Sequence, residues 1–428
     1  MASEATQADP VAGGAPRLAD FSFPSPEIAA CPYPFYQALR NEAPVYQYPG
    51  RNDFLISRRE DILQVMRQPE IFSNRLYLVD PLSPGADRRE VLEAPPPGGI
   101  ISTSFTLSHS DLPEHSIKRQ ALRSLINPRH IHSCEAAMRR IANELIDGFA
   151  HRGEVELRSE FANPLAILTI CEVAGFPAED KDTFLSWRRG TINQGRRFLT
   201  PEQLAAQPRE MEGRVQYVEA MILDRAAHPR DDFLSEAIQA QIARDGEINL
   251  PYLTGEMGLV LGAGSESTGQ LIANMMRLLI EHPDQLAKVV ADRSLVPGAV
   301  DEVLRYETPV QCTSRLVMED TEVGGVAVPK GAFVLMMYGA ANRDQTWSSP
   351  EEFNIERPAV RELSMAFGAG IHRCLGSPIA LAEGRIALEV MLERLKNPRF
   401  APGHEADREN IENFEKRAPK ALHIQFDA

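Results

Sequence analysis

The stretch FGAGIHRCLG, residues 367–376, decides the fold of this chain, and the rest of the sequence is interpreted outward from it. Its three glycines allow the backbone to turn tightly and to approach a flat group closely. His372 and Arg373 place positive charge beside the sulfur of Cys374, which favours the thiolate over the thiol. An electron-rich thiolate on a glycine-lined loop is suited to be the axial ligand of a haem iron.

A helix is predicted directly after this loop. Ser377 offers a capping hydroxyl, Pro378 suits the first helical position, and apolar residues recur until Asn397-Pro398, where the helix should end. The helix N-terminus would stabilise a thiolate at Cys374 further. Two other interpretations remain open at this point, a structural cysteine in a turn and one half of a zinc site with His372. The chain contains no CxxC pair, so the zinc interpretation is weakly supported.

The composition is that of a soluble globular protein. The chain has 428 residues, of which 43% are hydrophobic and 25% are charged. Its net charge of −15 disfavours nucleic acid as a partner. Five irregularly spaced cysteines argue against a disulfide framework and for a reducing compartment, so a cytoplasmic location is expected. Four of the cysteines are expected to be packing residues: Cys31, Cys134, Cys171 and Cys312.

The N-terminus and the overall hydropathy bear on domain organisation. Residues 1–19 are polar and rich in small side chains, so we expect a flexible tail there and no signal peptide. No apolar run is long enough to cross a bilayer, so no membrane association is expected. Residues 20–428 are expected to form a single domain.

The segment from Pro251 to His282 is predicted to be one long, mainly apolar helix. Its middle, GAGSEST at 262–268, is weakened by glycines that each cost about 1 kcal/mol relative to alanine. A single acid, Glu266, among apolar residues favours a functional groove over a purely structural kink.

Both stretches resemble one known family. Residues 367–376 resemble the haem-binding loop of the cytochrome P-450 family, and the order Ala263 to Thr268 resembles that family's oxygen-activation motif. The resemblance implies the cytochrome P-450 fold, which is mainly α with a small β-rich lobe (α+β), and haem b (iron protoporphyrin IX) as cofactor. It implies Cys374 as the metal ligand within a cofactor-binding set of Cys374, His115, Arg119, Arg315, His372, Ala263, Gly264, Phe367 and Gly368.

The resemblance also implies the catalytic residues Glu266, Ser267 and Thr268, which deliver protons to dioxygen beside small residues that leave it room. Ser267 stands where the family normally has Thr. Serine keeps the hydroxyl but lacks the methyl group that restricts the rotamer, so we expect slower or leakier oxygen activation. Thr268 is a poorer substitute because it points about 100° away on the helix.

The resemblance assigns four cationic side chains to the haem propionates. Asp111 is expected to cap a helix on which His115 and Arg119, four residues apart, share one face. From spacing alone this is equally a solvated basic face. The resemblance implies that this pair binds one propionate, and that Arg315 and His372 contact the other.

A Glu-Arg pair, Glu302 and Arg305, lies between the long helix and the cysteine loop. An isolated pair of this kind is a common surface ion pair of little energetic value. The resemblance implies that it joins Arg357 in a structural network that supports the haem loop.

The implied activity is monooxygenation, in which one oxygen atom of O2 enters a C–H bond of a small to mid-sized apolar substrate. Electrons are expected from NAD(P)H through a reductase and a ferredoxin that docks on a basic face made of Lys118, Arg123, Arg129, Arg373 and Arg385. A peroxide-driven haem enzyme and a haem protein that binds gas without turnover are the alternatives. The loop from Arg75 to Leu107 is expected to be a lid. Expected wall positions are Tyr77, Leu78, Trp187, Val310 and Phe414, and Gln311 and Cys312 are also expected to face the pocket.

Overall fold

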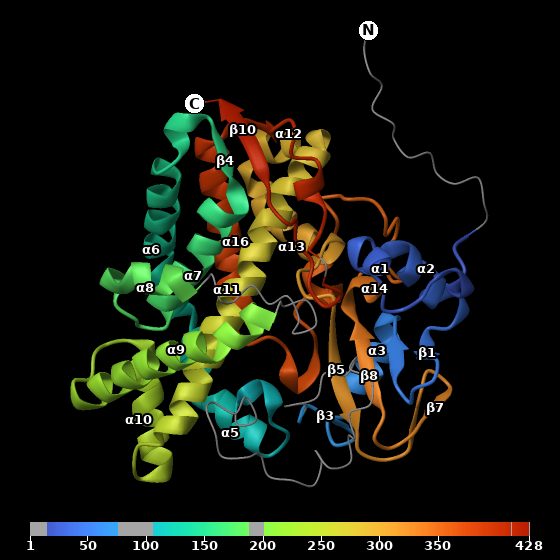
Figure 1. Ribbon diagram of the computed structural model, residues 1–428, viewed down its shortest axis with the longest axis horizontal. Helices are drawn as coiled ribbons and strands as arrows, with labels where there is room; N and C mark the ends of the chain where they lie inside the picture. Colours follow the sequence, from blue (N-terminus) through green and yellow to red (C-terminus); the bar gives the residue numbers. More distant parts are fainter. Residues whose placement is uncertain (1–14, 76–105, 188–200, 412, 428) are drawn as a thin grey trace.

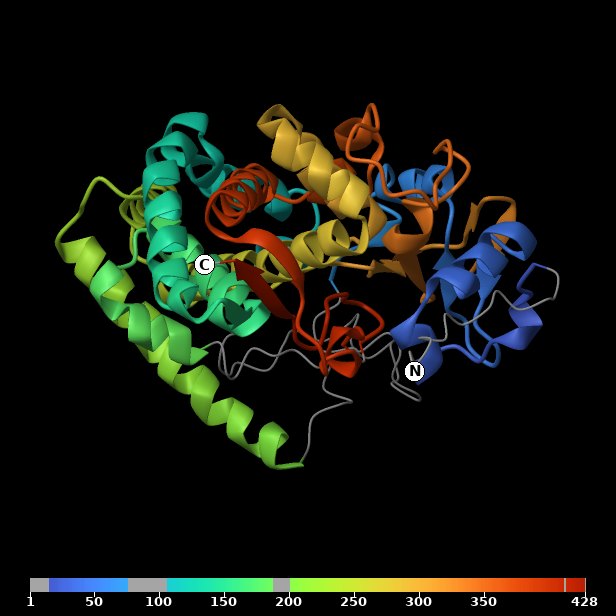
Figure 2. The same cartoon turned by 90° about the horizontal axis from the view of Figure 1, so that it is seen from above.

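The computed structural model describes residues 15–75, 106–187, 201–411 and 413–427 (Figure 1). A larger helical part and a smaller part with the main sheet lie side by side (Figures 1 and 2). This confirms the predicted mainly α fold with a small β-rich lobe. The predicted lid lies largely outside the described residues.

The longest helices, α11, α9 and α6, lie in the helical part (Figure 1). The α-helices are α1 (Pro26–Ala30), α2 (Tyr33–Glu42), α3 (Arg59–Met66), α5 (Glu114–Ala121), α6 (Pro128–Asp147), α7 (Asn163–Val173), α8 (Lys181–Trp187), α9 (Pro201–Ala227), α10 (Phe233–Asp245), α11 (Leu250–Glu281), α12 (Pro283–Ala291), α13 (Val296–Tyr306), α14 (Tyr338–Ala341), α15 (Val360–Leu363) and α16 (Ser377–Arg394). The strands are β1 (Val45–Gln47), β2 (Phe54–Ile56), β3 (Phe72–Ser73), β4 (Glu154–Glu156), β5 (Cys312–Val317), β6 (Thr321–Val323), β7 (Val326–Val328), β8 (Phe333–Met337), β9 (Lys396–Phe400) and β10 (His423–Asp427).

The strands among the described residues form three sheets. The largest has the order β1-β2-β8-β5-β3, in which β2 and β8 are parallel and the other neighbours are antiparallel. Strands β4, β10 and β9 form a second sheet, and β6 pairs with β7 across the turn Gly324-Gly325. In the largest sheet, β5, which carries Arg315, lies between β8 and β3.

Helix α11 is the centre of the helical part and packs against α7, α16, α9 and α13 (Figure 1). Its bounds agree with the predicted helix to within one residue. It is a continuous α-helix through residues 262–268, so the weakened middle does not break it. A Cβ on Gly264 would lie 2.6 Å from the side chain of Ile170, and one on Gly269 would lie 2.6 Å from Asn163 Oδ1. These two glycines therefore let α7 approach α11 closely.

Three of the four cysteines expected to pack are buried, namely Cys134, Cys171 and Cys312. The expectation is wrong for Cys31, which is exposed because it ends the short helix α1. Leu18, within the sequence expected to be a tail, packs against the apolar cluster of the sheet part. No helix among the described residues is both long and apolar enough to cross a membrane.

Glu307 joins distant parts of the chain in a buried polar cluster. Its carboxylate accepts hydrogen bonds from Tyr33 Oη at 2.6 Å and from Arg417 Nε at 2.5 Å. Arg277 lies 3.1 Å away on α11. Burial raises the pKa of Glu307, but Arg417, Arg277 and Arg343 together bring it down to about 2. The ionised carboxylate therefore stabilises the fold.

Replacing Glu307 by glutamine is expected to remove part of the protein's acid sensitivity. A glutamate has a pKa of about 4.3 in an unfolded chain. The stabilisation from Glu307 is therefore fully present above about pH 4.3 and is lost as the pH falls through the folded pKa of about 2. This difference corresponds to about 3 kcal/mol at neutral pH. Urea unfolding of the haem-loaded protein, repeated at a series of pH values, gives the free energy of unfolding of each variant. The difference in this free energy between wild type and Glu307→Gln should become smaller below about pH 4.

The control for this measurement is Glu393→Gln, because Glu393 is an exposed glutamate of α16 with a long 3.9 Å ion pair to Arg139. Its unfolding free energy should follow the wild-type pH profile throughout. Parallel profiles for wild type and Glu307→Gln would contradict the assignment of a low pKa to Glu307.

Candidate active site

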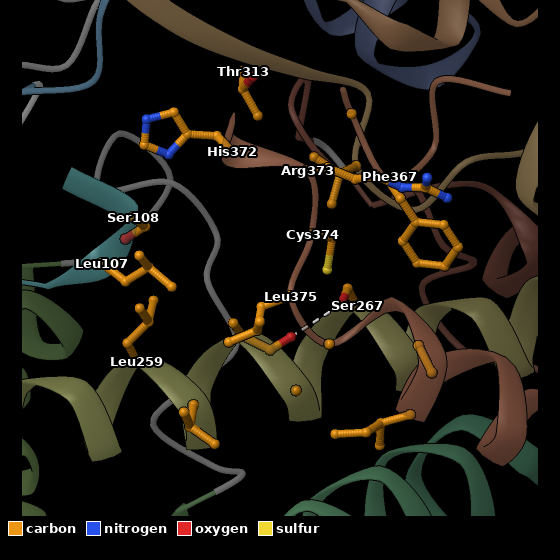
Figure 3. Close-up of a pocket in the computed structure, with 18 of the residues that line it drawn as sticks. Leu107, Ser108, Leu259, Ser267, Thr313, Phe367, His372, Arg373, Cys374 and Leu375 are labelled. Carbon is orange, nitrogen blue, oxygen red and sulfur yellow. Dashed lines mark hydrogen bonds between the residues drawn. The ribbon is translucent and has the colours of Figure 1, made fainter. Parts of the chain in front are cut away.

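A cavity of about 460 Å³ lies between α11 and the loop at 367–376 (Figure 3). Eleven of the twelve predicted site residues line it, and Glu266 does not. The lining divides into a cationic side, a strip of small residues on α11 and an apolar wall. The members of the predicted set that line the cavity are His115, Arg119, Ala263, Gly264, Ser267, Thr268, Arg315, Phe367, Gly368, His372 and Cys374.

Backbone contacts hold the cysteine loop in shape. The N–H of Cys374 donates to the carbonyl of Phe367 at 2.9 Å and so closes the loop. Gly368 and Gly370 have φ of +62° and +68°, a region that side chains disfavour. A Cβ on Gly370 would also lie 2.4 Å from the carbonyl oxygen of Met66. The first two glycines of the motif are thus required by the turn, whereas Gly376 has φ of −77° and is not.

The charge around the sulfur differs from the sequence-based expectation. Burial raises the pKa of the Cys374 thiol, while the N–H groups of Gly376 and Ser377 and the Arg119 and Arg373 guanidinium groups lower it by less. A bound metal cation would deprotonate the thiol outright. Ser377 is the first residue of α16 and Gly376 is its N-cap, so the expected serine cap is wrong by one position.

His372 does not supply the positive charge that the sequence suggested. Burial, together with Arg315, His115 and Arg119, lowers the pKa of His372 to about 2, so its imidazole is neutral. The error arises because the chain brings several cations to one wall of the cavity, which no local pattern shows.

These side chains form a polar wall suited to carboxylates. The His115 and His372 rings lie 4.3 Å apart between centroids. His115 Nε2 is buried and has no hydrogen-bond partner among the described residues. Burial lowers the pKa values of His115, Arg119 and Arg315. An anion here would both pair these cations and satisfy the buried nitrogen, as the carboxylates of haem propionates would.

Helix α5 places His115 and Arg119 without the expected cap. The carboxylate of Asp111 instead accepts hydrogen bonds from Ser73 Oγ at 2.5 Å and Asn74 N at 2.9 Å. It therefore fastens the chain before α5 to β3, and the N-cap of α5 is Pro113.

Two members of the proposed basic docking face differ from the expected arrangement. Lys118 is 4% exposed and lies 2.7 Å from Glu114, so it does not belong to an exposed face. Arg385 pairs with Glu135 and Glu389. Arg123, Arg129 and Arg373 are exposed.

Ser267 faces the cysteine across the cavity (Figure 3). Its hydroxyl donates to the carbonyl of Ala263 at 3.0 Å, one turn earlier on α11. Glu266 points elsewhere, and its carboxylate pairs with Lys416 Nζ at 2.5 Å. Successive helical residues diverge by about 100°, so a motif of adjacent residues cannot place all its members on one face.

The apolar wall was only partly predicted. Val310 lines the cavity as expected. Phe414 does not, because it packs against Phe23 with ring centroids 4.5 Å apart. Gln311 accepts a hydrogen bond from Tyr36 Oη and also points away. Cys312 belongs to the apolar cluster of the sheet part. Tyr77, Leu78 and the Trp187 side chain lie outside the described residues.

Two wall residues on α11, Leu259 and Val260, were not predicted from the sequence. Helical periodicity could have predicted Leu259, because it lies four residues before Ala263 and therefore on the same helical face. Leu107 and Ser108, on the 3-10 helix Leu107–His109, face Leu259 across the cavity (Figure 3).

Comparison with known proteins identifies the family. "Cytochrome P450 107B1" of Saccharopolyspora erythraea is 33% identical over 358 residues, which cover 82% of this chain and 84% of the relative. The chain belongs to the cytochrome P450 family. The family model for cytochrome P450 matches residues 209–420. "Cyclomarin C epoxidase CymV" of Salinispora arenicola is 30% identical to this P450, with 83% of this chain and 87% of the relative covered.

Solved structures agree with this assignment. Substrate-free CYP150A6 from Mycobacterium marinum superposes with a TM-score of 0.81 at 28% identity, covering 94% of this chain and 97% of that one. CYP109E1 from Bacillus megaterium in complex with corticosterone has a TM-score of 0.80 at 27% identity, covering 94% and 100%. The protein is a cytochrome P450 monooxygenase of a family that binds haem and uses O2 and a redox partner.

Proposed function

We propose that this P450 inserts one oxygen atom of O2 into a C–H bond of a small to mid-sized apolar substrate, with Cys374 as the ligand of the haem iron. The observation that supports this most directly is that Cys374 and Ser267 face each other across one cavity (Figure 3). Haem with a thiolate ligand supplies the binding of O2 and the cleavage of its O–O bond.

Other lining residues would hold this cofactor at its propionates and on its two sides. His115 and Arg119 line the cavity and would bind one propionate, and Arg315 and His372 would bind the other. The buried, unpaired Nε2 of His115 supports this role, since a carboxylate would satisfy it. Phe367 and Gly368 border the sulfur side, and Ala263 and Gly264 present little side chain on the opposite side.

Protons reach the cavity from α11. Ser267 Oγ is the hydroxyl that faces the reacting side, and Thr268 lines the same wall. Glu266 is 19% exposed and can exchange protons with solvent, and its carboxylate pairs with Lys416. The paired carboxylate points away from the cavity, so the ion pair with Lys416 must open first; Glu266 then takes up a proton from solvent and passes it toward Ser267.

The cavity walls indicate the substrate class. Leucine, isoleucine and valine side chains from α11, α7 and the chain before β5 face the cavity. Such walls exclude strongly charged substrates and accept apolar ones, such as a terpenoid or an aromatic compound. One relative is a 6-deoxyerythronolide B hydroxylase, and one matched structure is a complex with corticosterone. Electrons come from NAD(P)H through a reductase and a ferredoxin.

Spectral titration of the ferric haem protein with a library of apolar compounds tests this function. Compounds that shift the Soret band are then offered with O2, NADPH, a ferredoxin and its reductase. A hydroxylated product supports the proposal. Turnover with hydrogen peroxide but with no ferredoxin would instead support a peroxide-driven enzyme, and spectral binding without any product would support a ligand binder.

Ser267→Ala is expected to lower the product formed per NAD(P)H consumed by about tenfold or more, because a positioned proton donor typically contributes about 100-fold or more. Ser267→Thr should raise the same ratio above wild type, since the added methyl group restricts the rotamer. Ser265→Ala is the matched control: its hydroxyl bonds to Gly262 O at 3.3 Å and does not line the cavity. An unchanged ratio in Ser267→Ala would rule out this relay.

A further inference from the structure

Three side chains outside the cavity converge near the C-terminus. One ligand atom from each of His404, Asp407 and His423 lies within 4.8 Å of the other two. Asp407 Oδ2 lies 3.0 Å from His404 Nδ1 and 3.7 Å from His423 Nε2. None of the three lines the haem cavity. Two imidazoles and one carboxylate are a ligand set typical of divalent transition metals.

The backbone under this cluster is fixed on both sides. Asp407 lies in the 3-10 helix Ala406–Arg408, and its N–H bonds to the carbonyl of His404 at 3.2 Å. Its own carbonyl accepts from Ala421 N at 2.9 Å, and the carbonyl of His423 accepts from Ala401 N at 3.0 Å. The three side chains are 30–45% exposed, so an ion can reach them from solvent.

The spacing suits a small metal ion. In a tetrahedral zinc site with bonds of about 2.0–2.1 Å, neighbouring ligand atoms lie about 3.3 Å apart. The two distances to Asp407 Oδ2, 3.0 and 3.7 Å, lie on either side of that value. The rings of His404 and His423 are stacked at 3.8 Å with an interplanar angle of 19°, so one ring must turn for both nitrogens to reach one ion. The terminal torsion of histidine is broad and permits this turn.

We propose that His404, Asp407 and His423 bind one zinc ion, with water in the fourth position. A hydrogen bond to Asp407 alone would need only His404. The second ring, directed at the same carboxylate oxygen, completes a three-ligand set.

The ion would act on the chain between its ligands. The segment 404–423 carries Lys416, which pairs with Glu266, and Arg417, which pairs with Glu307. Zinc would hold the two ends of this segment together, and a ligand that binds the folded chain but not the unfolded chain raises the free energy of unfolding. The unfolding midpoint should therefore rise with zinc.

Calorimetric titration of the haem-loaded protein with ZnCl2 tests the site. Wild type is expected to take up one equivalent of zinc, and its unfolding midpoint should rise. Changes to residues that merely orient metal ligands cost about 10–100-fold in affinity, so replacing a ligand should cost at least tenfold. His404→Gln, Asp407→Asn and His423→Gln are therefore each expected to weaken uptake at least tenfold and to abolish the rise in midpoint.

The control is His228→Gln, which removes an exposed histidine outside the zinc cluster. His228 also lies 3.3 Å from an aspartate, Asp224, but this pair is not part of a three-ligand group. It should bind zinc as wild type does. The proposal fails if wild type shows no saturable uptake, if all three ligand variants retain it, or if only the control loses it. An unchanged Soret band in Asp407→Asn, which keeps the side-chain shape, shows that weakened binding is not misfolding.

Discussion

Replacement of Cys374 by serine is expected to abolish the red-shifted Soret band of the reduced, carbon-monoxide-treated protein, together with monooxygenase turnover. The sulfur of Cys374 faces Ser267 across the cavity (Figure 3). A serine hydroxyl is neither an electron-rich donor nor readily ionised, so the electron donation that favours O–O cleavage is lost. Replacing a residue that only orients a metal ligand already costs about 10–100-fold in activity. Loss of the ligand itself should therefore lower activity by more than about 100-fold.

The matched control is Cys31→Ser, since Cys31 is an exposed cysteine in α1's C-cap position and does not line the cavity. It should keep the wild-type spectrum and rate. A red-shifted band that persists in Cys374→Ser would show that another residue binds the iron and would overturn the proposed function. Haem content is measured in each variant, so that loss of the ligand and loss of the whole cofactor are distinguished.

The sequence predicted the haem loop and α11 well because both carry strong local constraints. The loop needs left-handed glycines at 368 and 370, and these leave a visible pattern. Helix α11 is long and apolar with a proline near its start, so its bounds were predicted to within one residue. The mid-helix glycines were also visible, but their role was not. Gly264 and Gly269 meet α7, and helix contacts of this kind depend on the fold.

Interactions between distant segments could not be predicted from the sequence. Glu266 pairs with Lys416, 150 positions later. Glu307 contacts Tyr33, Arg277 and Arg417, which lie in three separate segments of the chain. No local spacing links such residues, and their meeting depends on how the C-terminal segment folds back.

The neutral state of His372 has the same origin as these distant contacts. It follows from burial and from cations on other elements, so the local sequence suggested the opposite charge. Electrostatics inside a cavity are therefore the part of the site that the motifs predict least well.

Arg305→Ala is expected to lower the free energy of unfolding by about 3–5 kcal/mol, a large share of the about 5–15 kcal/mol that holds a typical protein folded. Arg305 is fully buried and donates to both carboxylate oxygens of Glu302 at 2.7 Å. Arg357, as predicted, is the third member, with Nε 3.2 Å from Glu302. Removing the guanidinium leaves Glu302 Oε2 without its hydrogen-bond donor in a site that water does not reach, while Arg357 still contacts Oε1.

The control for this change is Arg361→Ala in α15, because Arg361 is 50% exposed and pairs with Asp301, the neighbour of Glu302, at 2.9 Å. An exposed ion pair contributes at most about 1 kcal/mol to stability. The free energy of unfolding of Arg361→Ala should therefore lie within about 1 kcal/mol of the wild-type value. Urea unfolding, followed by the Soret band and by circular dichroism, measures both variants. Equal losses in the two variants would contradict the special role of the buried pair.

Arg305→Lys separates charge from shape within this network. The guanidinium also donates to the carbonyls of Asn342 at 3.0 Å, Pro350 at 2.9 Å and Glu352 at 2.9 Å. Lysine keeps the positive charge beside Glu302 but has three donors on one atom, so it cannot reach carbonyls that a planar fork reaches on two sides. We therefore expect Arg305→Lys to lose most of the stability that Arg305→Ala loses. Wild-type stability in Arg305→Lys would mean that the network acts through charge alone and that the orphaned carbonyls cost little.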